Sequence, residues 1–417
     1  MASRTVIIGG GIIGLACAYE LRRHGDEVVV LDRGELGAGA SAHNAGLIVP
    51  SFSAPLPGPG MVRAALRSMF RPDSPFYLNP RALPETAGWL RAFRRHANAR
   101  DQAAGLQAMA TLGASTMALF DELAADGVRF DMRSDGLLFA YLQEKEMEHT
   151  LHELERLEGV GYGRPALLSG PELRELEPGL SDGVTAGFLL PQERHVQPES
   201  LIAGLLAHLR QRGVQLRRGL PCTGVRRDKR RVTAALTPSS AIEGDRFLIA
   251  AGAWSGRIAQ MCGVRLPIQA IRGYSVTISD PIRQFRRPVY LGEARLIASP
   301  FERSTRVAGW LELSGIHPEI DRGRIRSLRH AAGAYLRTWE SGSAEREHAG
   351  LRPLAPDGLP VIGAVPGFDN LFAATGHGAL GITMAPPTAR ALAALMTGGE
   401  PQPTLDPFSP GRFRLRS

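Results

Sequence analysis

The pattern of apolar positions at the start of the chain predicts a strand, a helix and a second strand. Residues 5–8 form a short β-branched apolar run, residues 12–24 follow helical spacing, and residues 27–31 form a valine-rich run. Gly25 stands where a glycine commonly ends a helix. This order predicts a βαβ opening and therefore an α/β fold.

The apolar pattern changes twice further along the chain. Residues 55–84 are rich in proline and glycine, and residues 85–157 have mainly helical spacing, clearest at 108–123 and 144–157. A helix at 197–212 and strands at 214–217, 222–226 and 246–250 then resume the α/β pattern. Residues 266–345 alternate between apolar and polar positions, which predicts an antiparallel sheet carrying one helix near 321–340. A strand at 371–374, a glycine-rich turn at 376–381 and a helix reaching residue 396 follow.

Composition narrows the class of protein without identifying it. The 417 residues carry a net charge of +8, but the basic residues are scattered arginines and only two lysines, Lys145 and Lys229, so we expect no nucleic-acid partner. The three cysteines, Cys17, Cys222 and Cys262, stand far apart, so we expect neither a disulfide framework nor a metal site. A reducing, cytoplasmic setting fits this usage, and we expect neither a signal peptide nor a membrane-spanning segment.

A glycine motif connects the first predicted strand to the first predicted helix. Gly9, Gly11 and Gly14 form GxGxxG, with Ile12 and Ile13 between them, and Asp32 followed by Arg33 closes the second strand. In this context the glycines permit a tight turn, a close approach of the backbone to a pyrophosphate, and close packing of helix on strand. The acidic residue would accept hydrogen bonds from ribose hydroxyls. The motif predicts a bound dinucleotide and does not by itself separate FAD from NAD.

Further segments resemble the D-amino acid oxidase (DAO) family of FAD-dependent oxidoreductases, and within it the bacterial D-amino acid dehydrogenases. The resemblance covers nearly the whole chain. The segments that carry it, besides the glycine motif, are residues 40–48 (ASAHNAGLI), 246–255 (RFLIAAGAWS), 350–353 (GLRP) with 356–358 (PDG), 50–80 with its proline- and glycine-rich run and FRPDSP at 70–75, and 376–381 (GHGALG). His43 and Ala40 depart from the residues usual in these dehydrogenases.

The resemblance implies a Rossmann-like FAD-binding domain of the glutathione-reductase type and an α+β substrate domain built on an antiparallel sheet. The FAD-binding domain would combine residues 1–50, 190–265 and 346–400, and the substrate domain residues 51–189 and 266–345, with 401–417 as a tail. It also implies contacts to FAD beyond the glycine motif, from Ser41, Asn44, Ala45, Gly46, Leu47, Val225, Ala251, Gly252, Trp254, Gly378, Leu380, Gly381, Ile382 and Thr383. Because residues 348–351 contain no cysteine, we expect FAD to be noncovalent.

The activity that the resemblance implies is oxidative deamination of a small amino acid by hydride transfer from Cα to flavin N5, giving an imino acid that hydrolyses to a keto acid. Arg352 is the candidate for holding the substrate carboxylate, because a guanidinium forms two parallel hydrogen bonds and stays charged. Tyr274, Tyr290 and His377 are further candidates for the catalytic site, and His43 is a similar one.

Several alternatives stay open at this point. Residues 385–390 (APPTAR) look closer to secondary-amine enzymes of the hydroxyproline and opine type, and glycine or sarcosine is a related substrate class. A nucleotide-binding protein without redox chemistry is an alternative of another kind. The electron acceptor is oxygen or a quinone of an electron-transfer chain, and either peripheral attachment to the inner membrane or association with a partner subunit is compatible with the sequence.

Overall fold

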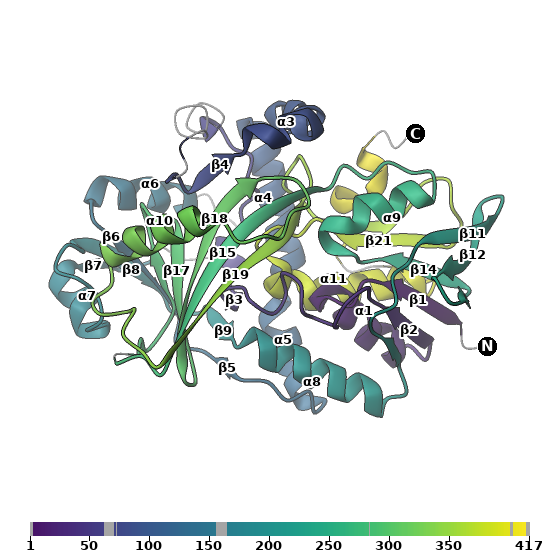
Figure 1. Ribbon diagram of the computed structural model, residues 1–417, viewed down its shortest axis with the longest axis horizontal. Helices are drawn as coiled ribbons and strands as arrows, with labels where there is room; N and C mark the ends of the chain where they lie inside the picture. Colours follow the sequence, from purple (N-terminus) through teal and green to yellow (C-terminus); the bar gives the residue numbers. More distant parts are fainter. Residues whose placement is uncertain are drawn as a thin grey trace.

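The structure is a computed structural model that describes residues 3–61, 71, 73–155, 165–282, 284–400 and 403–413. Figure 1 shows two halves side by side, each built around its own sheet, with both chain termini in the right-hand half. We call the half with a six-stranded sheet the cofactor domain, after the prediction, and the half with a nine-stranded sheet the sheet domain. This two-domain α/β arrangement agrees with the predicted fold class.

The predicted βαβ opening is confirmed. Strand β1 (Arg4–Ile8) leads into helix α1 (Ile12–Arg23), and the chain returns as β2 (Glu27–Leu31), which pairs with β1 in parallel. Gly25 turns the chain between them at φ +89°, a conformation that favours glycine.

The six-stranded sheet places β1 at its centre, because segments from three distant parts of the chain pair around it. The order is β10-β2-β1-β14-β21-β20, and only β20 runs antiparallel to its neighbour. The other strands are β10 (Gln215–Arg217), β14 (Arg246–Ile249), β20 (Val361–Ala364) and β21 (Leu371–Thr375). Alternate residues of β1 enter different cores: Ile7 packs under α1, whereas Val6 and Ile8 pack on the other face.

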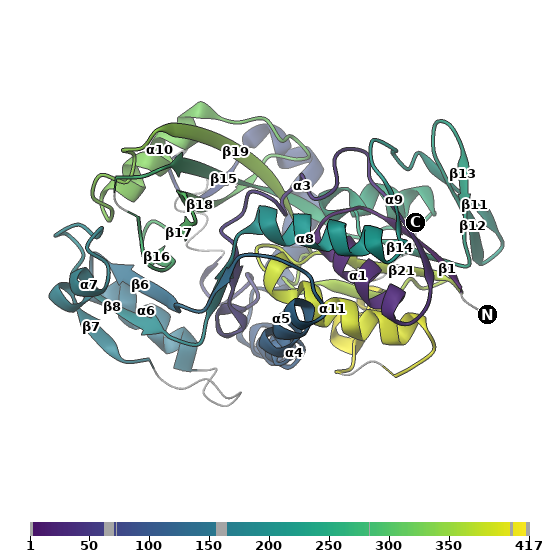
Figure 2. The same ribbon diagram turned by 90° about the horizontal axis from the view of Figure 1, so that it is seen from below.

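Helices cover one face of this sheet and a small sheet covers the other. Helix α1 packs along α11 (Gly381–Met396), and α8 (Pro198–Gln211) also packs against α1 (Figure 2). On the other face lie α9 (Ser255–Met261) and an antiparallel sheet of β11 (Gly224–Asp228), β12 (Arg231–Leu236) and β13 (Ala241–Glu243). The predicted strand at 222–226 therefore begins two residues later than expected.

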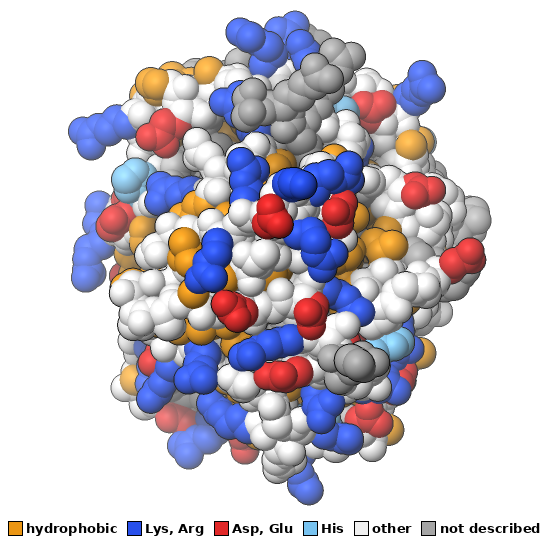
Figure 3. All heavy atoms as spheres, turned by 90° about the vertical axis from the view of Figure 1, so that its right-hand side faces the viewer, with side chains coloured by type: hydrophobic (Ala, Val, Ile, Leu, Met, Phe, Trp, Pro, Cys, Tyr) orange, Lys and Arg blue, Asp and Glu red, His pale blue; other side chains and the backbone are white. Residues whose placement is uncertain are grey.

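Basic and acidic side chains are interspersed at this end of the molecule, as Figure 3 shows. Ion pairs on β10–β13 and the neighbouring loops join Arg218 to Glu35, Arg226 to Glu243, and Arg230 to Asp369. These three arginine charges are therefore offset locally.

The sheet domain is built on nine strands in the order β19-β15-β18-β17-β16-β6-β8-β7, with β4 beside β18. Their bounds are β4 (Phe76–Leu78), β6 (Leu137–Tyr141), β7 (Leu167–Ser169), β8 (Ala186–Leu190), β15 (Gln269–Ser279), β16 (Val289–Leu291), β17 (Leu296–Phe301), β18 (Ser304–Leu313) and β19 (Ala344–Leu354). Most pairs are antiparallel as predicted, but β16–β6 and β18–β4 are parallel. The predicted helix near 321–340 is the shorter α10 (Arg322–Gly333), which packs on one face.

Strand β19 lies in the sheet domain, although most of it falls in the range 346–400 that was assigned to the cofactor domain. It pairs with β15 along its whole length. Strand β3 (Leu47–Ile48), which follows the loop after β2, forms a separate three-stranded sheet with β9 (Arg194–Val196) and β5 (Met132–Arg133). The domain boundaries themselves stay predictions.

The helical stretch predicted at 85–157 is interrupted. The helices are α3 (Leu83–His96), α4 (Ala99–Gly113), α5 (Thr116–Ala125) and α6 (Glu144–Glu155), with β5 and β6 between the last two. The single helix expected at 108–123 breaks at Ala114 and Ser115. The expected end at residue 157, and Phe70 and Pro72 in the stretch at 50–80, lie outside the described residues. Helix α7 (Gly170–Leu176) was not predicted.

One expectation about membranes needs correction. Residues 99–125, which comprise α4 and α5, are long and apolar enough to cross a membrane by length and composition alone. Half of that window is buried, and both helices pack against α11 (Figure 2), as core helices of soluble proteins also do.

Candidate active site

The glycine turn between β1 and α1 has no room for side chains at two positions. A Cβ at Gly9, which has φ +117°, would lie 2.3 Å from the carbonyl oxygen of Ala250, and a Cβ at Gly14 would lie 2.0 Å from that of Gly9. At Gly11 a Cβ would meet only Ser41 Oγ, at 3.2 Å. The turn is therefore packed tightly on the protein side and is open where a pyrophosphate would approach. Ile12 and Ile13 begin α1, whose N-cap, Gly11, has no side chain to satisfy the first amides.

Asp32 lies at the carboxyl end of β2, next to this turn. Its Oδ2 accepts a hydrogen bond from the Gly10 amide at 2.8 Å, and Oδ1 accepts one from the Gly34 amide at 2.9 Å. A carboxylate oxygen can accept two hydrogen bonds, so each keeps capacity for a ribose hydroxyl. The exposed Arg33 lies over the Trp254 ring at 3.7 Å, which brings together two predicted cofactor residues that are distant in sequence.

Other predicted cofactor residues surround the same sheet edge. Ala251 and Gly252 follow β14, the strand that pairs with β1, so they lie beside the glycine turn. Val225 lies on β11 and packs with Ala251 against the apolar core on the far face of the sheet. The carboxyl ends of parallel strands are where ligands bind in open α/β sheets, and this arrangement fits the adenosine part of FAD.

The loop at residues 40–46 is shaped by its own side chains. Asn44 donates from Nδ2 to the carbonyl oxygens of Ala40 and Ser41, and its Oδ1 accepts from the Gly46 amide at 2.7 Å. Ser41 Oγ accepts from the Ile12 amide at 3.0 Å, which joins the loop to the start of α1. The Asn44 amide therefore fixes the loop, and Ser41 links it to the glycine turn. The FAD contacts expected of Ser41, Asn44, Ala45 and Gly46 stay predictions.

The second glycine-rich turn leads into α11 and meets the end of this loop. Gly376 and Gly378 have φ +81° and +55°, and Leu380 is the apolar N-cap of the helix, so its side chain cannot satisfy the first amides. Thr383 Oγ1 donates to the Leu47 carbonyl and accepts from the Val49 amide, both at 3.1 Å. The start of α11 is thus tied to β3, with Gly381 and Ile382 in its first turn. The positive end of this helix dipole fits an anionic group such as a reduced flavin.

Arg352 lies on the edge strand β19, on the face that points toward the loop at 40–46. Alternate residues of a strand share a face, so His348 and Gly350 lie in the same row as Arg352. The His348 ring lies 4.0 Å from the His43 ring, and a Cβ at Gly350 would lie 3.5 Å from Ala40 Cα. The candidate carboxylate-binding residue therefore shares a sheet face with the contacts to the cofactor domain.

The guanidinium of Arg352 has no acidic partner in the part of the chain that the structure describes. It lies over Gly273, where a Cβ would be 2.0 Å from Nη1, and Nη1 donates to the Trp310 carbonyl at 2.6 Å. Burial lowers the pKa of Arg352 to about 10, and no carboxylate of the described residues offsets that effect. The group is still protonated at neutral pH, so a partly buried cation is available for an anionic ligand.

A bulge in β18 aims the Trp310 carbonyl at Arg352. Arg272 pairs with Glu312 and Tyr274 with Gly309, so two residues of β18 face Gly273. Trp310 adopts φ +62°, which is strained for an aromatic residue. Such local strain persists where the surroundings over-determine it, often at functional sites.

The structure does not bring Tyr274 together with Arg352. Tyr274 lies on the opposite face of β15, buried with Ile325 and Leu328 of α10, and its hydroxyl donates to Glu312 at 2.5 Å. Tyr290 does approach the cofactor side: with Phe52, Leu47 and Leu380 it belongs to one partly exposed apolar group around a common core. Their roles in the reaction stay predictions.

His377 is buried and turned toward α11. Its Nε2 lies 3.1 Å from Thr388 Oγ1, and Nδ1 has no hydrogen-bond partner among the described residues. Burial lowers the pKa of His377 to about 3, so the imidazole is neutral at physiological pH. This geometry favours a structural contact to the helix, and it provides no proton donor of ordinary histidine pKa.

Three residues at this site were not predicted from the sequence: Gly273, Trp310 and Arg306. Gly273 carried a usable signal, because a glycine within a strand often marks a close approach. Trp310 carried no such signal, because a bulge depends on the register in which two strands pair, and the sequence alone does not show that register. Arg306 also carried no signal, because it occupies a polar position of a strand with ordinary apolar–polar alternation, although the structure buries it. Among the described residues, no group of three or more His, Cys, Asp or Glu side chains could hold a metal ion.

Comparison with known proteins agrees with this geometry. Residues 4–395 match the family DAO, described as FAD dependent oxidoreductase. The chain is 31% identical over 405 residues to a D-amino acid dehydrogenase of Rhizorhabdus wittichii, covering 95% of this chain and 97% of that protein. It is 33% identical over 404 residues to a D-amino acid dehydrogenase of Xylella fastidiosa, covering 94% and 92%.

Solved structures show the same fold at lower identity. Glycine oxidase from Geobacillus kaustophilus superimposes with a TM-score of 0.78 at 23% identity, covering 99% of this chain and all of that one. L-proline dehydrogenase from P. horikoshii gives a TM-score of 0.77 at 19% identity, covering 99% and 98%. The family match spans nearly the whole chain, and the glycine turn, Asp32 and the start of α11 fit FAD: this chain belongs to the DAO family of FAD-dependent oxidoreductases.

Proposed function

We propose that this protein oxidises a small amino acid at the carbon that bears nitrogen, as a D-amino acid dehydrogenase does, giving an imino acid that hydrolyses to a keto acid. The observation that carries the proposal is Arg352, a partly buried cation that pairs with no carboxylate of the described residues. It lies on the sheet face toward the loop at residues 40–46, which we call the cofactor loop. Full-length relatives named D-amino acid dehydrogenase support the same substrate class. Bound FAD supplies the acceptor for the hydride.

The residues of this chain would bind and orient the substrate. Arg352 would hold the carboxylate by two parallel hydrogen bonds, which fixes the direction of the Cα–H bond. The partly exposed apolar side chains of Phe52, Tyr290 and Leu380 would contact the small side chain of the substrate. The first amides of α11, beyond Leu380, would stabilise negative charge that develops at the cofactor during reduction.

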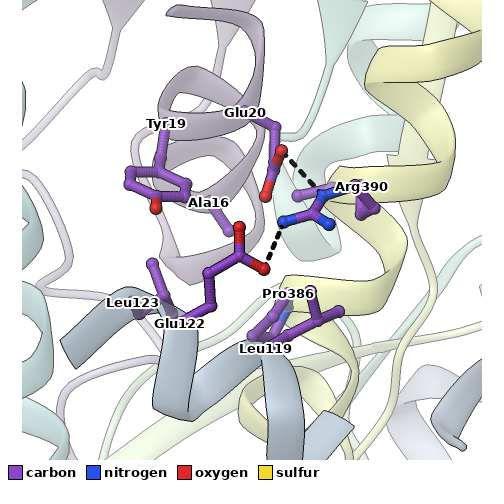
Figure 4. A pocket seen from close by; sticks show the side chains of 9 residues that line it. Ala16, Tyr19, Glu20, Leu119, Glu122, Leu123, Pro386 and Arg390 are labelled. Carbon is purple, nitrogen blue, oxygen red and sulfur yellow. Dashed lines mark hydrogen bonds and ion pairs between the residues drawn. The ribbon is translucent and has the colours of Figure 1, made fainter. Parts of the chain in front are cut away.

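The sequence feature that favoured secondary-amine substrates lies in α11, where Thr388 contacts His377. Residues 385–390 fall within α11, and Figure 4 shows Pro386 and Arg390 at its contact with α1 and α5. There Arg390 pairs with Glu20 at 3.0 Å and Glu122 at 2.9 Å, around a gap of only about 10 Å³. Pro387 cannot donate to the Thr383 carbonyl, which accepts from Thr116 Oγ1 instead. Pro386, Pro387 and Arg390 thus have roles in helix packing, and the choice between a primary and a secondary amine rests on the substrates themselves.

A panel of substrates under anaerobic conditions tests the proposal. Small D-amino acids are expected to bleach the flavin absorbance of the holoenzyme fastest, followed by N-substituted amino acids such as sarcosine, D-hydroxyproline and an opine. L-amino acids of the same side chains are the matched control. Bleaching by secondary amines alone would replace the proposed substrate class. A flavin that no amine bleaches would leave only a cofactor-binding role.

Release of FAD on denaturation is a second expected outcome. Acid or heat precipitation should leave the flavin in the supernatant, because the thiols are poorly activated for a covalent link. Cys17 and Cys262 are buried, Cys222 is partly buried, and burial raises the pKa of Cys222 and raises that of Cys262 to about 12. Supernatant absorbance measures the released fraction, and mass spectrometry identifies it as FAD. Yellow colour that remains with the precipitate would contradict noncovalent binding.

The acceptor and location complete the proposal. Oxygen and a quinone are the two acceptor classes, and the rate of flavin reoxidation by each separates an oxidase from a dehydrogenase. We place the protein in the cytoplasm, with peripheral inner-membrane attachment or a partner subunit as the associations that a quinone acceptor would require.

A further inference from the structure

The loop at residues 40–46 belongs to the cofactor domain, but side chains of the sheet domain hold its backbone. Ser275 Oγ donates to the His43 carbonyl at 3.0 Å, and Ser299 Oγ donates to the Ala45 carbonyl at 2.7 Å. Arg306 contributes two more bonds: Nη1 donates to the carbonyls of Asn44, at 2.9 Å, and Ala42, at 3.3 Å. Four consecutive carbonyl groups, from Ala42 to Ala45, are therefore fixed from outside the loop.

Arg306 is itself rigidly placed. It lies on β18 with only 5% of its surface exposed, and its guanidinium lies 5.0 Å from the centre of the Phe301 ring. Nε donates to Thr277 Oγ1 at 2.9 Å, and Nη2 pairs with Glu199 at the start of α8 in the cofactor domain. The side chain thus bonds to its own sheet, to the loop and to α8 at once.

The bonds to the loop carbonyls also orient the loop amides. A peptide unit is planar, so the direction of each carbonyl sets the direction of the N–H group of the next residue. The bonds from Arg306 to Ala42 and Asn44 therefore orient the N–H groups of His43 and Ala45. Ala45 lies among the residues expected to contact FAD, and its neighbour Gly46 has φ +70° with no room for a side chain.

We propose that Arg306 is a positioning residue for FAD. It is a cation of the sheet domain that bonds two carbonyls of the cofactor loop, while Ser275 and Ser299 bond the two others, and together they hold the loop in its FAD-binding conformation. Glu199 is its counter-ion. Arg306 also stands four residues before Trp310 on β18, so one strand positions both the cofactor loop and the guanidinium of Arg352.

Titration of the apoprotein with FAD, followed by flavin fluorescence, tests the proposal without any substrate. Arg306→Met is expected to raise the Kd for FAD by roughly tenfold to a hundredfold, as the loss of charge-assisted hydrogen bonds predicts. Arg306→Lys keeps the charge but not the fork, and should give an intermediate Kd. Arg303→Met is the matched control, because Arg303 lies on the turn before the same strand and pairs with Asp280 at the surface.

Thermal unfolding separates positioning from general stability. Ligand binding raises stability in proportion to the logarithm of ligand concentration over Kd, so the FAD-induced rise in Tm should shrink in Arg306→Met and Arg306→Lys. Equal losses of Tm with and without FAD, at an unchanged Kd, would show that Arg306 only stabilises the fold and would overturn the proposal. If Arg306→Met does not fold, Arg306→Lys and Glu199→Gln provide the same comparison, and wild-type Kd values in both would also overturn it.

Discussion

Replacing Arg352 with alanine is expected to lower kcat/KM for amino acids by roughly a hundredfold or more while FAD stays bound. The substrate carboxylate would be left desolvated and unpaired, at a cost of about 2–5 kcal/mol. The fold should persist, because the Arg352 guanidinium pairs with no carboxylate of the described residues and bonds only to the Trp310 carbonyl. Steady-state kinetics with a small D-amino acid and the flavin absorbance of the purified variant measure both effects.

Two comparisons make the Arg352 result specific. Arg352→Lys keeps a positive charge without the two-pronged geometry, and should lie between wild type and the alanine variant. A primary amine without a carboxylate should react equally poorly with all three proteins. Near-normal kcat/KM in Arg352→Ala with full flavin content would place the carboxylate elsewhere and would remove the main support for an amino acid substrate.

The cofactor half of this site could be predicted from sequence because its constraints are local. The turn at Gly9, Gly11 and Gly14 lies within six residues, and a Cβ at Gly9 or Gly14 would overlap backbone atoms. Asp32 follows at the end of the next strand, where its carboxylate bonds to the amides of Gly10 and Gly34. Such requirements leave a pattern of residue types at fixed spacing, which a single sequence displays.

The sheet-domain half could be predicted only in part, because its geometry depends on strand register. The alternation in residues 266–345 predicted strands, but the register places Arg352 and Gly273 on one face and Tyr274 on the other. A shift by one residue would exchange the faces. Tyr274 was therefore as plausible as Tyr290 from the sequence, although Glu312 accepts the hydrogen bond of its hydroxyl on the side of α10.

Charged residues that link the two domains could not be assigned from sequence at all. Arg306 and Glu199 are separated by more than a hundred residues, and nothing local distinguishes Arg306 from the many arginines of this chain. Its burial follows from the packing of β18 against the cofactor loop. A glycine inside a strand is more informative, because the missing side chain implies something close by.

Gly273→Ala is expected to lower kcat/KM by roughly tenfold to a hundredfold, mainly through a higher KM. The new Cβ would lie 2.0 Å from Arg352 Nη1 and 2.4 Å from Cζ, whereas carbon atoms in contact are separated by about 3.5–4.0 Å. The guanidinium must therefore move by about 1 Å or more, and a displacement of that size in a positioning group can cost about a hundredfold in rate. Alanine is compatible with this strand, because Gly273 does not have a positive φ.

Gly350→Ala is the matched control for this prediction, because Gly350 is the cross-strand partner of Gly273 in the β15–β19 pair. Its Cβ would lie 3.5 Å from Ala40 Cα and 3.9 Å from His348 Nε2, which are ordinary contacts. This variant should keep near-normal kcat/KM, and both variants should keep their flavin and their Tm. If both alanine variants lower kcat/KM equally, the loss comes from a disturbed β15–β19 strand pair and not from displacement of Arg352. If Gly273→Ala keeps a normal KM, substrate binding does not require the guanidinium to lie over Gly273, and the position assigned here to the substrate carboxylate is wrong.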